Sequence, residues 1–425
     1  MSRLLCKIEG DIPPNLSIPN DRSILVISKS QRYLTHGLHK YPAKFIPEYP
    51  RWAIQKYAFK NHNLILEPFC GSGTSNVEAK LAGYDSLAID VDPLARLITK
   101  VKTTHLDENL LTSEKDRLLH SFNKLRIQSD LPENYELIEN WFRPEVAHRL
   151  SFIHKSITDI DDENTRNFFL VCLSSTIRRV SNADPNLVLP KISRFMRARE
   201  QKGRKINVFD TFEKILVNNC KRIMDFSKTT SQTTKVEIIG NDARNINAED
   251  DSISIAVTSP PYLNAHDYVR AHKLEMFWLG MIKNSDDLKS LDRNYVGTER
   301  IYAKEYSEIP AIDISELDLK IKSISKIDKK RAYITAKFFL DMDKHFQEIF
   351  RILQERGHYV MFVGNNVVRK TPILTHKYLT TLAERNNLKT ELRFSSPLIK
   401  RFEVQSGRKD YGGFIDSDWI LVFGK

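Results

Sequence analysis

The feature that most constrains the fold is a tight alternation of strand and helix patterns between residues 64 and 101. The apolar run LILEPF at 64–69 predicts a strand, and SNVEAKLAG at 75–83 predicts a helix. SLAID at 86–90 predicts a second strand, and DPLARLITKV at 92–101 predicts a second helix. Strands and helices that alternate over so short a span are typical of a parallel α/β sheet.

The same patterns divide the rest of the chain. Residues 105–232 have few glycines and few β-branched clusters, and they read as helical. We therefore predict a sheet domain in two parts, 1–104 and 233–425, separated by a helical insertion at 105–232, with a polar excursion at 281–330. Further strands are expected at 23–28, 236–240, 253–259, 358–364 and 419–424, and a helix is expected at 47–60.

The loop after the strand at 64–69 has the chemistry of a ligand-binding turn. Gly71 and Gly73 let the backbone approach a ligand closely, and the N–H groups of the following helix can hold a polar or anionic group. Asp90 ends the next strand about twenty residues later, where an acid accepts hydrogen bonds from a ribose. A nucleoside-containing cofactor is predicted. A nicotinamide dinucleotide is disfavoured, because Asn76 replaces the third glycine of its fingerprint.

A second loop, TSPPY at 258–262, follows the strand expected at 253–259. The two prolines stiffen the loop and remove two N–H donors, so its carbonyl groups remain as acceptors. The Ser259 hydroxyl, a rigid carbonyl and the Tyr262 ring form a suitable clamp for a planar base that carries an amino group. In a parallel sheet this loop and the glycine loop emerge at the same carboxyl edge, where ligands bind.

Composition narrows the class of protein. The chain has 425 residues and a net charge of +11, which favours an anionic partner such as nucleic acid. Its four cysteines include no Cys-x-x-Cys pair, so we predict no metal site, no disulfide framework and a cytoplasmic location. No apolar run is long enough for a transmembrane helix, and the N-terminus lacks the apolar core of a signal peptide. A membrane partner is therefore not expected.

Four motifs resemble those of one enzyme family. EPFCGSGT at 67–74 resembles the cofactor motif of S-adenosylmethionine-dependent DNA amino-methyltransferases. TSPPY at 258–262 is similar to their catalytic motif, in the form typical of the cytosine-N4 group. HGLHKYPAKFIPE at 36–48 resembles the segment that lines the methionine side of the pocket, and GNDARN at 240–245 resembles the acidic segment near the adenine. Glu67 departs from the pattern, because the family usually has Asp there.

The resemblance implies a Rossmann-like class I methyltransferase sheet, mostly parallel, with a helical insertion. It implies S-adenosyl-L-methionine as the cofactor and base flipping of double-stranded DNA. The implied catalytic residues are Ser259, Pro260, Pro261 and Tyr262. The implied cofactor-binding residues are Tyr41, Lys44, Phe45, Glu67, Phe69, Gly71, Ser72, Gly73, Thr74, Asp90 and Asp242.

The densest basic run, at 191–205, predicts contacts with DNA phosphates from within the helical insertion. Phe195 and Met196 are expected to pack this run onto the body of the protein. His266 and His272 flank the catalytic motif without metal-ligand spacing, so we expect structural roles for both. The predicted phosphate-binding residues are Lys191, Arg194, Arg197, Arg199, Lys202, Arg204 and Lys205.

The resemblance favours a cytosine-N4 DNA methyltransferase, monomeric, nucleoid-associated and paired with a restriction endonuclease. The absence of a Pro-Cys pair argues against a carbon-5 enzyme, which needs a thiolate nucleophile. Three alternatives remain open: an adenine-N6 DNA methyltransferase, an RNA base amine methyltransferase, and a non-catalytic DNA-binding specificity subunit. The intact glycine and TSPPY segments speak against the last of these.

Overall fold

The computed structural model describes residues 4–42, 45–59, 64–122, 130–133, 135–263, 268–398 and 417–425. The strands are β1 (Leu4–Glu9), β2 (Ser23–Ile27), β3 (Leu64–Glu67), β4 (Asp85–Ile89), β5 (Val236–Gly240), β6 (Ile253–Thr258), β7 (Leu353–Gly364), β8 (Asn366–Val368), β9 (Thr371–Ile373), β10 (Lys389–Pro397) and β11 (Ser417–Gly424). The α-helices are α1 (Glu48–Tyr57), α2 (Thr74–Leu81), α3 (Pro93–Thr103), α4 (Glu108–Ser121), α5 (Pro144–Thr158), α6 (Glu163–Val180), α7 (Arg194–Gln201), α8 (Val208–Thr229), α9 (Tyr268–Trp278), α10 (Ser285–Asn294), α11 (Ser315–Ser325), α12 (Lys329–Ile352) and α13 (Thr375–Arg385).

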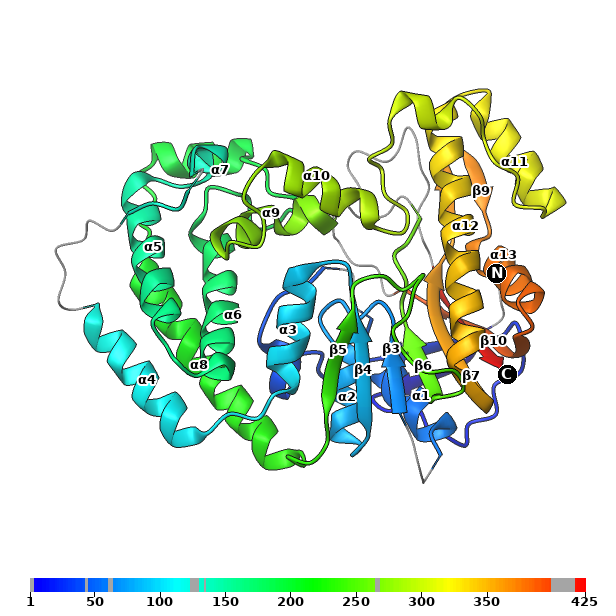
Figure 1. Ribbon diagram of the computed structural model, residues 1–425, viewed down its shortest axis with the longest axis horizontal. Coiled ribbons are helices and arrows are strands. Elements are labelled where there is room, and N and C mark those ends of the chain that lie inside the picture. The colour runs from blue at the N-terminus through cyan, green and yellow to red at the C-terminus, as the bar shows by residue number, and fades with distance from the viewer. Residues whose placement is uncertain are drawn as a thin grey trace.

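The centre of the molecule is a twisted sheet with the order β1-β2-β10-β11-β7-β6-β3-β4-β5 (Figure 1). Strand β11 runs antiparallel to β7 and β10, and the other neighbouring pairs are parallel. This topology confirms the mostly parallel, Rossmann-like fold. The strands β3 and β6 are direct neighbours, with Leu66 opposite Ala256, so the glycine loop and the TSPPY loop leave the sheet side by side.

The sheet is buried on both faces because its strands alternate apolar side chains between two cores. Ile255 and Val257 of β6 pack in the core beneath α1, whereas Ala256 packs with α12 and α13 on the opposite face. The strands β7 and β11 divide their side chains in the same way. The central strands therefore form a rigid base for the loops at their carboxyl ends.

The helices α4 to α8 occupy the stretch that the sequence marks as helical, and they lie beyond the β5 end of the sheet (Figure 1). Helix α6 packs against α3 and α9 as well as against α5 and α8. Its buried side chains, including Phe168 and Leu173, share one apolar core with Leu94 of α3 and Leu274 of α9. The helical segment is therefore continuous in its packing with α3 and α9.

Several elements differ from the sequence-based expectations. Strand β1 was not expected; it forms the sheet edge beside β2, and its alternating exposure leaves it only a weak apolar pattern. Strand β7 begins at Leu353, ahead of the expected 358–364. The polar Glu355 and the positive φ of Arg356 interrupt the apolar run, so the sequence pattern does not indicate the first part of the strand. Strand β10 and helix α13 were also not anticipated. The polar excursion at 281–330 contains the helices α10 and α11.

None of the helices in the described ranges combines the length and the apolar character that crossing a bilayer requires.

Candidate active site

The glycine loop between β3 and α2 is shaped by two residues with left-handed backbone. Gly71 has φ of 49° and Gly73 has φ of 71°, a region that favours glycine. A Cβ at Gly73 would lie 2.8 Å from Oγ1 of Thr99, and one at Gly71 would lie 3.2 Å from the ring of Tyr41. The loop thus passes close to both neighbours, and α2 begins directly after it at Thr74.

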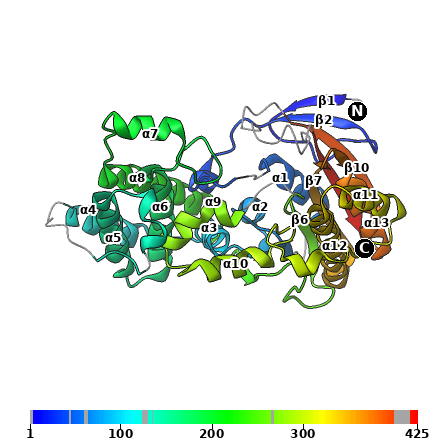
Figure 2. The same cartoon turned by 90° about the horizontal axis from the view of Figure 1, so that it is seen from above.

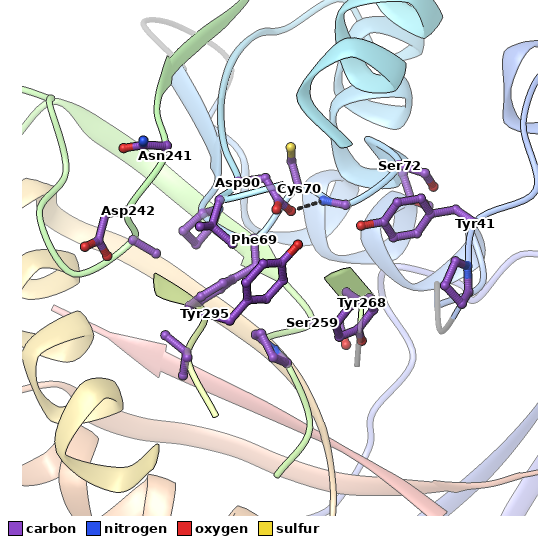
Figure 3. Close-up of a pocket in the computed structure, with 18 of the residues that line it drawn as sticks. Tyr41, Phe69, Cys70, Ser72, Asp90, Asn241, Asp242, Ser259, Tyr268 and Tyr295 are labelled. Carbon is purple, nitrogen blue, oxygen red and sulfur yellow. Dashed lines mark hydrogen bonds between the residues drawn. The ribbon is translucent and has the colours of Figure 1, made fainter. Parts of the chain in front are cut away.

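Asp90, just beyond the end of β4, holds this loop from the side. Its Oδ2 accepts a hydrogen bond from the Gly71 N–H at 2.7 Å (Figure 3), and its Oδ1 accepts one from the Asp92 N–H at 2.8 Å. Burial raises the pKa of Asp90 to about 6, and the nearby Asp92 carboxylate adds to this effect. At neutral pH the carboxylate is ionised, and each oxygen keeps a lone pair for a ligand.

A cavity of about 730 Å³ opens between the two loops. Asn241 and Asp242 lie at one end, whereas Tyr41 and Ser72 lie at the other (Figure 3). The lining residues are Tyr41, Pro42, Phe45, Pro68, Phe69, Cys70, Gly71, Ser72, Thr74, Asp90, Val91, Asn241, Asp242, Ala243, Ser259, Pro261, Tyr268, Asn294, Tyr295 and Val296.

Most of the residues assigned to the cofactor by resemblance face this cavity. Those on its wall are Tyr41, Phe45, Phe69, Gly71, Ser72, Thr74, Asp90 and Asp242, together with Ser259 and Pro261 of the TSPPY loop. Among the described residues, Glu67, Gly73, Pro260 and Tyr262 are not part of the lining. Lys44 and His266 lie outside the residues that the structure describes.

The structure places Glu67 beneath the glycine loop, not on the cavity wall. Its side chain is buried, and its Oε2 accepts a hydrogen bond from the Ser75 hydroxyl of α2. Burial raises the pKa of Glu67 to about 8, so the carboxyl group is mainly protonated at neutral pH. The observed contact is structural: it joins the end of β3 to the first turn of α2.

Two tyrosines on the cavity wall were missed by the sequence analysis. The rings of Tyr268 and Tyr295 stack with centroids 6.2 Å apart and an interplanar angle of 9°. Tyr268 begins α9, six residues after the TSPPY motif, and this proximity was a usable signal. Tyr295 follows α10 in the polar excursion, where no local pattern marks it as part of a site.

His272 joins α9 to the cofactor side of the fold. Its Nδ1 lies 2.9 Å from Oδ2 of Asp92, and both side chains are buried. Burial alone would lower the pKa of His272, but the Asp92 carboxylate outweighs it and raises the pKa above the usual value. The imidazole also packs against the ring of Tyr41, with centroids 4.7 Å apart. These contacts fit the expected structural role.

The basic run forms α7 and its flanks on the outside of the helical segment (Figure 2). Met196 is buried as expected, but Phe195 is 53% exposed and does not pack the helix onto the body. The Arg204 guanidinium donates to the carbonyl oxygens of Ser181 and Arg179 and pairs with Glu200. Its partners therefore lie within the protein. The exposed cations of the run are Lys191, Arg194, Arg197, Arg199, Lys202 and Lys205.

Comparisons with known proteins return methyltransferases. Type II methyltransferase M.MvaI of Kocuria varians is 27% identical over 392 residues, covering 87% of this chain and 85% of that protein. Type II methyltransferase M.BsoBI of Geobacillus stearothermophilus is 22% identical over 411 residues, covering 85% of this chain and 80% of that protein. No family model matches the chain. A SAM-dependent methyltransferase structure from Methanosarcina mazei covers 91% of this chain and 98% of its own, with 10% identity and a TM-score of only 0.32.

Proposed function

We propose that this chain is a DNA methyltransferase that transfers a methyl group from S-adenosyl-L-methionine to the N4 amino group of cytosine in duplex DNA. The observation that carries the proposal is the shared cavity: Ser259 of the TSPPY loop and Asp90 with the glycine loop line one space. The Type II methyltransferase names of relatives that match most of the chain support DNA as the substrate.

The donor set fits S-adenosyl-L-methionine, which supplies an electrophilic methyl group when bound. The Asp90 carboxylate is an acceptor suited to the two hydroxyls of a ribose. Asn241 and Asp242, at one end of the cavity, offer acceptors for an adenine amino group, and Phe69 and Val296 offer apolar surface for its ring. Ser72 and Thr74 offer polar groups at the start of α2.

The TSPPY loop supplies what an exocyclic amine needs in order to react. The lone pair of such an amine is delocalised into the base, so the nitrogen is a poor nucleophile. An acceptor at each amino hydrogen, the Ser259 hydroxyl oxygen and the Pro260 carbonyl oxygen, draws the nitrogen toward tetrahedral geometry. The freed lone pair would then attack the methyl carbon directly while the carbon–sulfur bond breaks and a neutral thioether leaves, and the methylated nitrogen would release one proton to water. Positioning would carry this transfer without a covalent enzyme intermediate.

The product of the reaction tests the proposal. The purified chain is incubated with labelled S-adenosyl-L-methionine and DNA from a host that lacks DNA methyltransferases, and the digested nucleosides are identified by mass spectrometry. We expect N4-methylcytosine. N6-methyladenine as the sole product would contradict the cytosine assignment, and methylation of RNA but not of DNA would contradict the DNA assignment.

The exposed cations of α7 are expected to contact DNA phosphates. Replacing Arg194, Arg197 and Arg199 with glutamine should weaken DNA binding for all sequences and reduce the slope of log affinity against log salt by about 0.9 per lost contact. The slope is measured by fluorescence anisotropy on a labelled duplex at several salt concentrations.

The control makes the same change of charge elsewhere in the helical segment. Replacing Lys155, Lys214 and Lys221 of α5 and α8 with glutamine should leave the slope within about one contact of the unmodified protein. Equal slopes for the unmodified chain and the α7 variant would show that α7 is merely solvated.

A further inference from the structure

Hydrogen bonds join the end of the TSPPY loop to the strands β8 and β11, which come much later in the sequence. The Tyr262 hydroxyl donates a hydrogen bond to Oδ1 of Asp418 at 2.7 Å. The next carbonyl group, that of Leu263, accepts a hydrogen bond from Nδ2 of Asn366 at 2.5 Å. Both partners are more than 100 residues away in sequence, at separations of 156 and 103.

The topology explains why Asp418 reaches this loop. Strand β11 is antiparallel to β7, so its first residues lie at the carboxyl edge of the parallel strands. Asp418 is paired in register with Gly364, the last residue of β7, and β7 lies beside β6. The carboxylate is therefore placed two strands away from the point where the TSPPY loop leaves the sheet.

The surroundings of Tyr262 keep its hydroxyl protonated, so that it remains a hydrogen-bond donor to Asp418. Burial, followed by the Asp418 carboxylate, raises the pKa of Tyr262 well above its usual value, so the phenol stays protonated. The Ser259 side chain, three residues earlier in the loop, opposes this shift and lowers the pKa of Tyr262, but burial and Asp418 outweigh it. Asp418 thus holds Tyr262 at the end of a loop whose first residue, Ser259, lines the cavity, although Asp418 itself is not part of the cavity wall.

We propose that Asp418 is a positioning residue for methyl transfer, an inference that rests on the proposed function. Its carboxylate fixes the orientation of the Tyr262 ring and, through Tyr262, the course of the loop that carries Ser259. Half-buried Tyr262 then presents one face to the flipped base, while Ser259 keeps its oxygen toward the amine. A misplacement of about 1 Å near the reacting atoms can reduce the rate of the reaction by about 100-fold.

The test is a double-mutant cycle on single-turnover methyl transfer to unmethylated plasmid DNA at saturating S-adenosyl-L-methionine. We expect D418A and Y262F each to slow transfer by about 10-fold or more, and the double variant to be no slower than the slower single variant. D418N keeps an oxygen acceptor and should retain most of the rate. Cofactor affinity, measured by calorimetry, should stay within about twofold throughout, because Asp418 does not line the cavity.

The matched control is D343A, which removes a carboxylate on α12 that pairs with Arg385 at 3.0 Å, outside the cavity wall. Its rate should equal that of the unmodified chain. Multiplicative losses in the double variant, or a D418N rate as low as that of D418A, would overturn the inference. If D418A does not fold, the rates of Y262F and D418N still test the inference. A Y262F rate equal to that of the unmodified chain, or a folded D418N with a strongly reduced rate, would contradict it. No transfer by the unmodified chain would instead contradict the proposed function.

Discussion

Replacing Ser259 with alanine is expected to lower the single-turnover rate of methyl transfer about 100-fold or more, the usual effect of losing one positioned hydrogen-bond partner. Ser259 lines the cavity directly after β6, and in the proposed mechanism its hydroxyl oxygen accepts one of the two amino hydrogens. Without it, the amine keeps its lone pair in the ring. The affinity for S-adenosyl-L-methionine should be nearly unchanged, since Asp90 and the glycine loop are untouched.

The measurement is transfer of labelled methyl groups to unmethylated DNA, with calorimetric titration of the cofactor beside it. The matched control is S254A, on the same strand. The Ser254 hydroxyl is buried and donates to the Leu64 carbonyl oxygen at 3.2 Å, far from the loop end of β6. It should reduce stability by about 1 kcal/mol and leave the rate unaffected. Full activity in the Ser259 variant would rule out the proposed role of the loop.

Replacing Asp90 with alanine is expected to weaken cofactor binding by about 1–3 kcal/mol, which is roughly 5- to 150-fold in Kd. Two effects combine. The variant loses the acceptor for the ribose hydroxyls, and it releases the Gly71 and Asp92 N–H groups that the carboxylate now holds. Asp90→Asn keeps one oxygen acceptor and should fall between the alanine variant and the unmodified chain.

Calorimetric titration with S-adenosyl-L-methionine measures both variants. Asp85 provides the control, because it lies at the opposite end of β4 and its Oδ1 accepts a hydrogen bond from the Lys235 N–H at 2.7 Å. D85A should bind the cofactor as the unmodified chain does. An unchanged Kd in D90A would remove Asp90 from the site, whatever the methylation product.

Short-range patterns were sufficient for the central part of the fold. The alternation over residues 64–101 became β3, α2, β4 and α3 with boundary shifts of at most two residues. These segments are predictable because their apolar side chains recur at the period of the element they form. Asp92 also caps α3, accepting from the Leu94 and Ala95 N–H groups as its position suggests.

The direction in which an individual side chain points could not be predicted from such patterns. Glu67 belongs to the cofactor motif, yet its carboxyl group faces Ser75 beneath the loop. Arg204 belongs to the basic run, yet the Ser181 and Arg179 carbonyl oxygens take up its guanidinium. Residue type and spacing state what a side chain can bind, whereas its direction depends on which elements pack around it.

The sequence by itself determined the alternating sheet, the glycine turn and the stiff TSPPY loop, because each follows from residues within a few positions of one another. Only the tertiary structure decided what meets those loops. Tyr295 reaches the cavity from the excursion after α10, and Asp418 reaches Tyr262 from a strand 156 residues away. The physical reason is the strand order: the antiparallel β11 brings its first residues to the edge where β6 ends, and no local pattern encodes that pairing.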